Sequence, residues 1–393
     1  MNDIADPNTD EAPAEQRRPV ILQVVPELAI GGAERATIDM ARAVIEAGGR
    51  AIVASAGGEL APNLLRTKAE LITLPVASKN PLVIRRNARK LAQLIRAEGV
   101  DLVHARSRAP AWSAYRATQR VGCPFVTTFH APYNYSNALK KRYNAVMTKG
   151  DRVIAISEFI GQHVRDNYGI GDDRLRVVPR GIDIVDFDPA AVSPDRVANL
   201  AARWNLPDGK PVVMLPGRLA RWKGQMVMVD AMAQLAERDV ICLMVGVGSG
   251  REGLYRELEK KIQALGLATT VVLIDACTDM AAAYRLADVV VSASIEPEGF
   301  GRVAVEGQAM GVPVVATGHG GAVETVDPGV TGWLVPPDDA TALAEGIKNA
   351  LELGAEARAR LSALARARVA EHFTKPRMCA DTLSVYRELI DWP

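Results

Sequence analysis

Short apolar runs alternate with helical patterns along this chain, and the whole alternation occurs twice. The first series has its runs at 20–25, 51–55, 71–74, 102–104, 124–130, 152–157 and 175–179. The second has its runs at 211–215, 240–245, 271–274, 289–292 and 314–316. Runs that are rich in valine and isoleucine and bounded by turn residues are typical of strands buried on both faces. Because helices separate them, the sequence predicts two parallel, doubly wound α/β sheets in tandem.

Two such sheets imply two domains, since a chain of 393 residues exceeds the size at which a single hydrophobic core stops growing. Residues 1–18 are polar and acidic, and we expect them to form a disordered tail. Residues 19–189 form the predicted first domain, which ends in a linker at 181–189, and residues 190–376 form the second. Sheets of this kind bind ligands at the carboxyl ends of their strands, so the sequence predicts a site in the cleft between the domains.

The most informative stretch follows the strand at 289–292 and reads Glu296-Pro-Glu-Gly-Phe-Gly-Arg-Val-Ala-Val-Glu306. Gly299 and Gly301 allow backbone N–H groups to approach a ligand, and the helix N-terminus that follows favours an anionic group. Glu298 lies in the loop and Glu306 on the helix, so one carboxylate can face each end of a ligand. Carboxylates accept hydrogen bonds from vicinal hydroxyls, such as those of sugars and ribose. The alternative is a helix cap followed by a solvated glutamate.

The whole string resembles the E-x7-E signature of the retaining glycosyltransferases of family 4, with Gly-Phe-Gly between the two acids. The resemblance covers nearly the whole chain beyond residue 19. Gly217-Arg218 and Lys223-Gly224 resemble the family's clamp on a diphosphate. The Thr-Phe-His string that ends at His130 matches the family's histidine beside the transferred sugar. Arg302 departs from the family pattern, which often has an aliphatic residue there.

This resemblance implies the GT-B fold, two Rossmann-like domains with an interdomain cleft, in which the last helix (here within residues 377–393) packs back on the first domain. It implies four catalytic residues, Glu298, His130, Arg218 and Lys223. Glu298 is expected to bind hydroxyls of the transferred sugar, and the two cations are expected to neutralise the diphosphate. The expected donor-binding residues are Gly31, Gly32, Gly299, Phe300, Gly301 and Glu306, the last of which would bind the ribose. By itself, a Gly-Gly pair before a helix is as often a plain turn.

Composition and spacing exclude several other classes. No apolar run approaches the roughly 18 to 20 residues that cross a bilayer, and residues 1–18 lack the apolar core of a signal peptide, so we expect a cytoplasmic protein. The four cysteines lack ligand spacing, which favours reduced thiols over a zinc site. Asp186-Phe-Asp188 has the Asp-x-Asp form of metal-dependent transferases, but it lies in the predicted linker and is interpreted as a turn and a cap. We expect no metal and no cofactor besides the donor.

Charge is unevenly distributed along the chain. Residues 20–190 carry 24 Lys and Arg against 16 Asp and Glu, whereas residues 191–393 carry 21 against 25. Within residues 81–149 there are thirteen basic side chains and only two acids, Glu98 and Asp101. One interpretation is a solvated helix face. Nucleic-acid binding is not expected, because no stacking motif or known module accompanies the charge. The favoured interpretation is contact with an anionic membrane surface or a phosphorylated glycolipid.

Together these features predict a metal-independent, retaining glycosyltransferase. It would move a hexose-like sugar from a nucleoside diphosphate sugar to a glycolipid or polysaccharide acceptor, as in lipopolysaccharide or exopolysaccharide assembly, with peripheral attachment to the inner membrane as an option. Two alternatives stay open. One is a nucleotide-sugar epimerase or hydrolase of the same fold, because a fold does not determine its chemistry. The other is a non-catalytic protein that only binds the nucleotide sugar.

Overall fold

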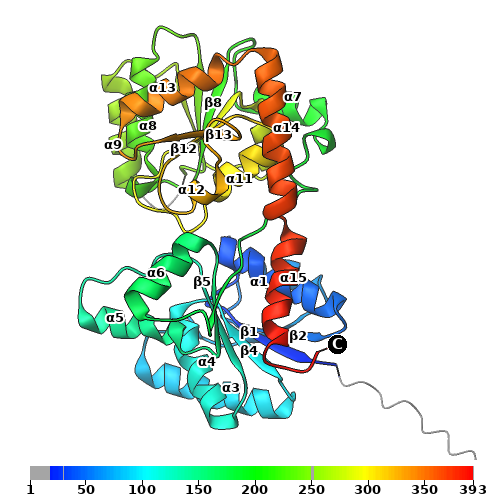
Figure 1. Cartoon of the computed structure of the whole chain (residues 1–393). Coiled ribbons are helices and arrows are strands. Elements are labelled where there is room, and N and C mark those ends of the chain that lie inside the picture. The colour runs from blue at the N-terminus through cyan, green and yellow to red at the C-terminus, as the bar shows by residue number, and fades with distance from the viewer. Residues whose placement is uncertain (1–17, 30, 249–251, 393) are drawn as a thin grey trace, which may run out of the picture.

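The computed structural model describes residues 18–29, 31–248 and 252–392. The predicted disordered tail at 1–18 therefore lies outside the described residues except for Arg18. Figure 1 shows two domains stacked one above the other, with the N-terminal domain in blue to green and the C-terminal domain in green to orange. The predicted pair of tandem, doubly wound sheets is confirmed.

The N-terminal domain is built on a seven-stranded parallel sheet with the order β3-β2-β1-β4-β5-β6-β7. Its strands are β1 (Val20–Val24), β2 (Arg50–Ser55), β3 (Glu70–Thr73), β4 (Leu102–Ala105), β5 (Phe125–Phe129), β6 (Arg152–Ala155) and β7 (Leu175–Val177). Strand order reverses between β1 and β4, so the loops after these two strands diverge to opposite faces and open a crevice between them.

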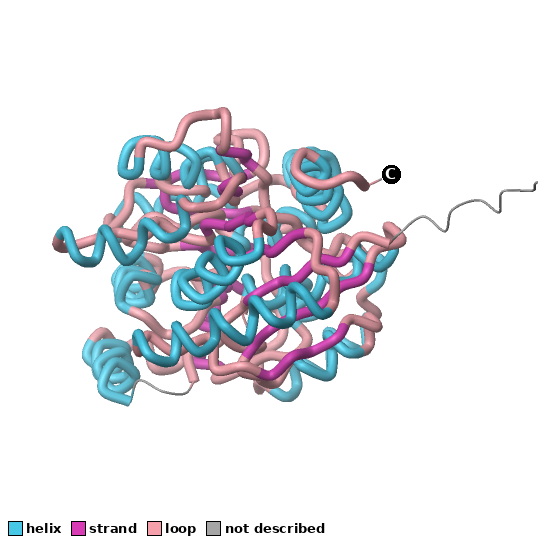
Figure 2. The backbone as a smooth tube through the Cα atoms, turned by 90° about the horizontal axis from the view of Figure 1, so that it is seen from below, coloured by secondary structure: helices cyan, strands magenta, loops and turns pink. Residues whose placement is uncertain are grey.

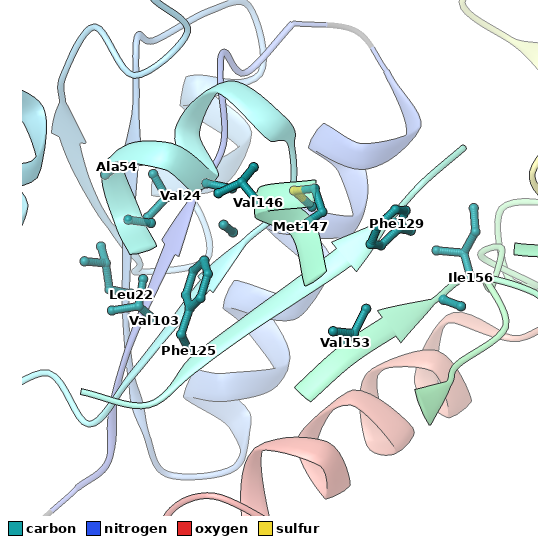
Figure 3. Packing of buried hydrophobic residues seen from close by; sticks show 14 of the residues in the cluster. Leu22, Val24, Ala54, Val103, Phe125, Phe129, Val146, Met147, Val153 and Ile156 are labelled. Atoms are coloured by element: carbon teal, nitrogen blue, oxygen red, sulfur yellow. The ribbon is translucent and has the colours of Figure 1, made fainter. Parts of the chain in front are cut away.

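The helices of this domain connect the strands and cover both faces of the sheet. They are α1 (Gly32–Glu46), α2 (Ala61–Leu65), α3 (Pro81–Ala97), α4 (Arg108–Val121), α5 (Ala138–Asn144), η1 (Ala145–Thr148) and α6 (Glu158–Tyr168). Side chains along β1 therefore point alternately to the two faces of the sheet. Ile21 faces the core with α1, whereas Leu22 and Val24 face the core that includes Phe125 and Val146. Figure 3 shows the second of these cores from close by.

The C-terminal domain repeats the plan with a six-stranded parallel sheet in the order β10-β9-β8-β11-β12-β13. Its strands are β8 (Val212–Pro216), β9 (Ile241–Val245), β10 (Val271–Ile274), β11 (Val289–Ser292), β12 (Val314–Thr317) and β13 (Gly332–Val335). The order reverses between β8 and β11, which places the switch point at the ends of these two strands. β13 is an edge strand that the apolar runs did not predict.

The remaining helices are η2 (Pro189–Ala191), α7 (Pro194–Arg203), η3 (Arg221–Lys223), α8 (Gln225–Gln234), α9 (Glu252–Ala264), α10 (Met280–Leu286), α11 (Arg302–Ala309), α12 (Ala322–Thr325), α13 (Ala340–Leu351), α14 (Ala355–His372) and α15 (Lys375–Arg387). Viewed from below in Figure 2, helices lie on both sides of the strands. Three helices in succession, α13, α14 and α15, follow β13.

The last helix returns to the first domain. α15 packs against α1, and Met378, Leu383 and Tyr386 belong to the same core as Ile21 (Figure 1). The chain crosses between the domains twice, at the linker after β7 and at the break before α15. The two crossings are held side by side because Ile182 N donates to Phe373 O at 2.8 Å and Lys375 N donates to Ile182 O at 2.8 Å.

Candidate functional site

Most of the predicted site residues follow strands that border the switch points. Arg218 and Lys223 come after β8, and Glu298 comes after β11. These two strands are neighbours at the position where the order of the second sheet reverses, so their carboxyl ends bring the three side chains together. From the N-terminal domain, Gly31 and Gly32 follow β1, and His130 follows β5.

Two adjoining cavities lie between the domains, and together they contain every predicted site residue. The sugar-side cavity, of about 470 Å³, is lined by His130, Arg218, Lys223, Glu298, Gly299, Phe300 and Gly301. The nucleotide-side cavity, of about 900 Å³, is lined by Gly31, Gly32 and Glu306 together with Tyr284 and residues 277–281. Arg302 and Val303 line both cavities, so the two volumes adjoin at the start of α11.

Glu298 is held by a cation and a hydroxyl. Lys223 Nζ donates to Glu298 Oε1 at 2.7 Å, and Ser294 Oγ donates to the same oxygen. Both side chains of the ion pair are largely buried, so solvent screens their attraction weakly. Oε2 of Glu298 has no hydrogen-bond partner among the described residues, so this oxygen can accept a hydrogen bond from a ligand in the sugar-side cavity.

Glu306 has a different environment in the nucleotide-side cavity. It is only 8% exposed, and each of its oxygens has a partner. Tyr284 Oη donates to Oε2 at 2.8 Å, and Arg302 Nη2 donates to Oε1 at 2.6 Å. Burial, and then the neighbouring carboxylate, raise the pKa of Tyr284 well above its usual value, so its hydroxyl stays a donor. The arginine that departs from the family pattern thus fixes one predicted acid in place.

The predicted cation pair shares an aromatic neighbour. Arg218 Cζ lies 5.9 Å and Lys223 Nζ lies 4.5 Å from the centroid of the Trp222 ring. The Arg218 side chain makes no ion pair with the described residues, and it is exposed at the wall of the sugar-side cavity. Trp222 therefore positions one free cation and one carboxylate-bound cation at the end of β8, where a diphosphate would need them.

The Gly-Phe-Gly loop approaches the other domain closely. A Cβ atom on Gly299 would lie 2.9 Å from the backbone oxygen of His130, and Ser157 Oγ donates to Gly299 O at 2.6 Å. Gly301, the N-cap of α11, has φ +86°, a conformation that disfavours a side chain. Phe300 lines the cavity through part of its surface, but its ring packs at 5.6 Å against Phe373 in the core.

The imidazole of His130 is oriented by contact with an arginine, Arg180, that the sequence analysis did not predict. Arg180 Nη1 lies 3.2 Å from His130 Nδ1, and Arg180 Nη2 donates to the carbonyl of Gly32. Arg180 thus links two predicted site residues that follow different strands. Burial, Arg180 and Arg106 together lower the pKa of His130 well below its usual value, so the imidazole is neutral at pH 7.

Sequence reasoning missed Arg180, Ser294, Tyr284 and Trp222. Two of them carried a usable signal, because Ser294 and Arg180 both come just after strands, at the functional edge of such sheets. Tyr284 carried none, since an aromatic residue within a helix is ordinarily a core residue. The sequence analysis interpreted Asp186-Phe-Asp188 as a turn and a cap, and in the structure Asp188 does cap η2, because its Oδ1 accepts a hydrogen bond from the N–H of Ala190 at 3.0 Å.

The described residues contain no group of three or more His, Cys, Asp or Glu side chains arranged to hold a metal ion. No helix among them is both long and apolar enough to span a bilayer. Part of the basic segment lies on the exposed surface of α3. Arg85, Arg86, Arg89 and Lys90 of α3 are all exposed and make no ion pair with the part of the chain that the structure describes.

Family models match both halves of the chain. The model described as Glycosyltransferase Family 4 matches residues 30–186, and the model described as Glycosyl transferases group 1 matches residues 197–368. Among curated relatives, a D-inositol 3-phosphate glycosyltransferase of Xylanimonas cellulosilytica is 33% identical over 314 residues, which are 76% of this chain and 74% of the relative. The enzyme of the same description from Salinispora arenicola is 33% identical over 322 residues, covering 76% and 71%.

Solved structures agree with these matches over the whole fold. A glycosyltransferase from Rickettsia africae is 38% identical, with a TM-score of 0.88, and the alignment covers 95% of this chain and 98% of that one. Anabaena HepE, solved in complex with UDP and glucose, is 26% identical with a TM-score of 0.81, covering 94% and 99%.

Proposed function

This chain belongs to glycosyltransferase family 4, and we propose that it transfers a hexose-like sugar, with retention of anomeric configuration, to a glycolipid or polysaccharide acceptor. As a GT-B glycosyltransferase it uses a nucleotide sugar as donor. We propose UDP as the nucleotide, because HepE was solved with UDP and glucose. One observation carries the proposal. All ten predicted residues line two adjoining cavities between the domains, one suited to a sugar diphosphate and one to a nucleoside.

Each part of the donor has a matching group. The ribose hydroxyls would bind Glu306, which Tyr284 and Arg302 hold in place. The diphosphate would lie between Arg218, Lys223 and the backbone N–H groups at the N-termini of α1 and α11. The transferred sugar would contact Glu298, and His130 lies beside it as a lining residue of the same cavity. Lys223 contacts Glu298 in this structure, so it lies between the sugar and phosphate positions and can serve both.

The reaction breaks the bond from the anomeric carbon to the diphosphate oxygen. Negative charge then develops on that oxygen, and the two cations and the helix N-termini stabilise it. The acceptor hydroxyl forms its bond to the anomeric carbon on the face that the diphosphate leaves, and its proton passes to the departing oxygen. We propose that no divalent metal is needed, because the side-chain cations already provide the positive charge that a metal would supply.

We propose that the acceptor is membrane-linked and that the protein works on the cytoplasmic side of that membrane. The exposed basic residues of α3 support this proposal, as do the exposed leucines at the starts of α3 and α5. Leu82 is 78% exposed and Leu139 is 79% exposed, and each precedes basic residues. Each basic residue near an anionic surface contributes about 1 kcal/mol. A lipid-linked acceptor of the lipopolysaccharide or exopolysaccharide type fits such a surface.

The test begins with a thermal-shift panel of UDP-, GDP- and ADP-sugars, since a ligand that binds the native state raises its stability. The sugar that stabilises most is then incubated with glycolipid acceptors, with and without EDTA, and the product is analysed by NMR. We expect an α-linked product from an α-linked donor at an unchanged rate in EDTA. An altered free sugar without an acceptor would indicate an epimerase or hydrolase, and stabilisation without turnover would indicate a binding protein.

A further inference from the structure

A third, much smaller cavity lies next to His130, within the N-terminal domain and α15. It has a volume of about 20 Å³. Its lining is largely apolar, with the charged or titratable side chains of Arg106, His130 and Arg180 and the hydroxyls of Thr128 and Thr382. A volume of this size holds one water-sized or slightly larger sphere. It excludes groups of several heavy atoms, such as phosphate or a carboxylate.

Three buried nitrogen atoms on the residues that line this cavity have no hydrogen-bond partner among the described residues. They are Arg106 Nη2, His130 Nε2 and Arg180 Nε. Arg106 is 4% exposed and Arg180 is 8% exposed, so solvent does not replace the missing partners. Buried polar groups in native proteins are almost always hydrogen-bonded. Three such atoms on residues that line one small cavity therefore point to an occupant.

All three atoms are donors. A guanidinium has no acceptor, so Arg180 Nη1 must donate to His130 Nδ1 across their 3.2 Å contact. In the neutral imidazole the proton then lies on Nε2, which becomes a donor as well. The occupant must accept hydrogen bonds from two guanidinium groups and one imidazole.

The charge around the cavity is uncompensated. Arg106 Nε donates to the neutral Gln23 Oε1 at 2.8 Å, and Arg180 donates to a carbonyl and an imidazole. Neither makes an ion pair with a described carboxylate. Asp39 and Glu34 act on these arginines only from a distance, and Asp39 lies 3.6 Å from Lys375. Burial lowers the pKa of Arg180 to about 9, because the charged guanidinium is removed from water without a counter-charge beside it.

We propose that this cavity binds a monoatomic monovalent anion of the size of chloride, held by Arg106, Arg180 and the Nε2–H of His130. A water molecule accepts two hydrogen bonds and carries no charge, so it would leave one donor unsatisfied and both guanidinium charges unpaired. An anion satisfies all three donors and offsets one positive charge in a region of low dielectric, where the attraction is strong.

The anion would act on the donor site through Arg180. The same guanidinium contacts His130 and the carbonyl of Gly32, and both of these residues line the donor cavities. Holding Arg180 in place therefore fixes two groups that follow different strands. The binding of the anion is independent of the proposed function, and only its effect on turnover rests on that function.

The direct test is a crystal of the full chain soaked in bromide, with data collected at the bromine absorption edge. We expect an anomalous peak in the cavity, within about 3.5 Å of the three nitrogens. Density for a water without anomalous signal in that cavity would overturn the proposal. This result decides the question even if variants of Arg106 fail to fold.

A solution measurement compares the melting temperature in sodium chloride and sodium gluconate at constant ionic strength. We expect chloride to raise it saturably by about 1–2 °C. The Arg106→Gln variant should lose this response. Arg368→Gln is the matched control, because Arg368 also has a buried Nε without a partner but does not line the cavity. An equal chloride response in both variants would contradict the proposal.

Discussion

At the scale of single residues, the two glutamates of the E-x7-E signature differ in how many of their carboxylate oxygens accept hydrogen bonds from the protein. Both oxygens of Glu306 are bonded, to Tyr284 and Arg302, so it is a fixed acceptor in the nucleotide-side cavity. Glu298 keeps one oxygen free and shares its other oxygen between Lys223 and Ser294. Lys223 is also the proposed partner of the diphosphate, so the contacts of Glu298 are expected to rearrange as the donor reacts.

These environments predict separate losses for the two acids. Glu306→Ala should weaken nucleotide binding about 10- to 100-fold, because it removes charged hydrogen bonds to the ribose. Glu298→Ala should keep nucleotide binding and lower kcat at least 100-fold. Thermal shift with the nucleoside diphosphate and a transfer assay separate the two effects. Glu259→Ala is the control, since the exposed Glu259 of α9 lines neither cavity and the variant should keep most activity. A fully active double variant at 298 and 306 would defeat both roles.

Buried histidines give the protein a predicted pH dependence. Burial lowers the pKa of His104 and His130 well below the usual value of about 6.5. Below pH 6.5 the two histidines bind more protons in the unfolded chain than in the native protein. The free energy of unfolding therefore falls as the pH drops through 6.5. Above pH 7.5 the histidines are neutral in both states, so they do not change the free energy of unfolding. The loss at pH 5.5 should be about 1.4 kcal/mol for each histidine.

Urea unfolding at pH 7.5 and 5.5 measures this loss. The His130→Gln variant should lose less stability between the two pH values than the wild type, by about the contribution of one histidine. An identical difference in the two proteins would show that His130 is already protonated or exposed.

The sequence predicted the site residues that belong to a characteristic motif. It did not predict the residue that acts by contacting distant parts of the chain. Glu298, Glu306, Arg218 and Lys223 belong to strings with a characteristic spacing, and all four line the cavities. Arg180 acts on residues that are far away in the chain, His130 and Gly32. A contact of that kind depends on how the strands are placed side by side, and no local pattern encodes it.

At the scale of elements, the loop between β11 and α11 depends on contact with the N-terminal domain. Glu324 in α12 strengthens this contact, because it accepts hydrogen bonds from the backbone N–H groups of Glu158 and Phe159 at the start of α6, at 2.8 and 2.6 Å. Together with the bond from Ser157 to Gly299, these contacts hold the two domains together at the edge of the sugar-side cavity.

A methyl group at Gly299 should disturb this contact. The added Cβ would lie 2.9 Å from the carbonyl of His130, so either the loop or the domain pair must shift. We expect Gly299→Ala to lower kcat/KM about 100-fold, because small misplacements of reacting groups cost this much. Gly253→Ala in α9 is the control, since its Cβ would meet nothing within 4 Å. That change should stabilise the protein by about 0.4–1 kcal/mol and leave activity intact. Wild-type kinetics in Gly299→Ala would contradict the close approach.

The elements themselves were mostly predictable. Strands such as β11 are continuous valine runs buried on both faces, and they lie where the sequence predicted them. β13 was missed because Gly332–Val335 is a half-buried edge strand with a glycine and a tryptophan, which leaves no continuous apolar run. The break between α13 and α14 lies next to Gly354, the N-cap of α14, and a single glycine within a long helical pattern is a weak signal of such a break.

At the scale of the whole molecule, the excess of basic residues in the first half of the sequence belongs to the N-terminal domain, and the excess of acidic residues in the second half belongs largely to the C-terminal domain. The exposed basic residues of α3 lie on the N-terminal domain, whereas the predicted donor-site residues with side-chain charge, Arg218, Lys223, Glu298 and Glu306, come from the C-terminal domain. One domain is thus suited to hold the donor, and the other to face an anionic surface that carries the acceptor.

Charge reversal on α3 tests this division. The Arg85→Glu, Arg89→Glu double variant should bind anionic vesicles at least tenfold more weakly than the wild type at low salt. The matched control reverses Arg256 and Lys260, two exposed basic residues of α9, and should bind as the wild type does. Vesicle sedimentation measures both. Equal binding of the wild type to neutral and anionic vesicles would remove the membrane proposal without affecting the donor site.

The central claim, that the paired interdomain cavities hold an activated sugar, is tested most directly by a crystal structure with the nucleotide sugar that stabilises the protein most. We predict ribose hydroxyls at Glu306, the diphosphate between Arg218 and Lys223, and sugar hydroxyls at Glu298. A nucleotide sugar bound elsewhere, with Lys223 and Arg302 still engaging their glutamates around an unliganded groove, would contradict the account.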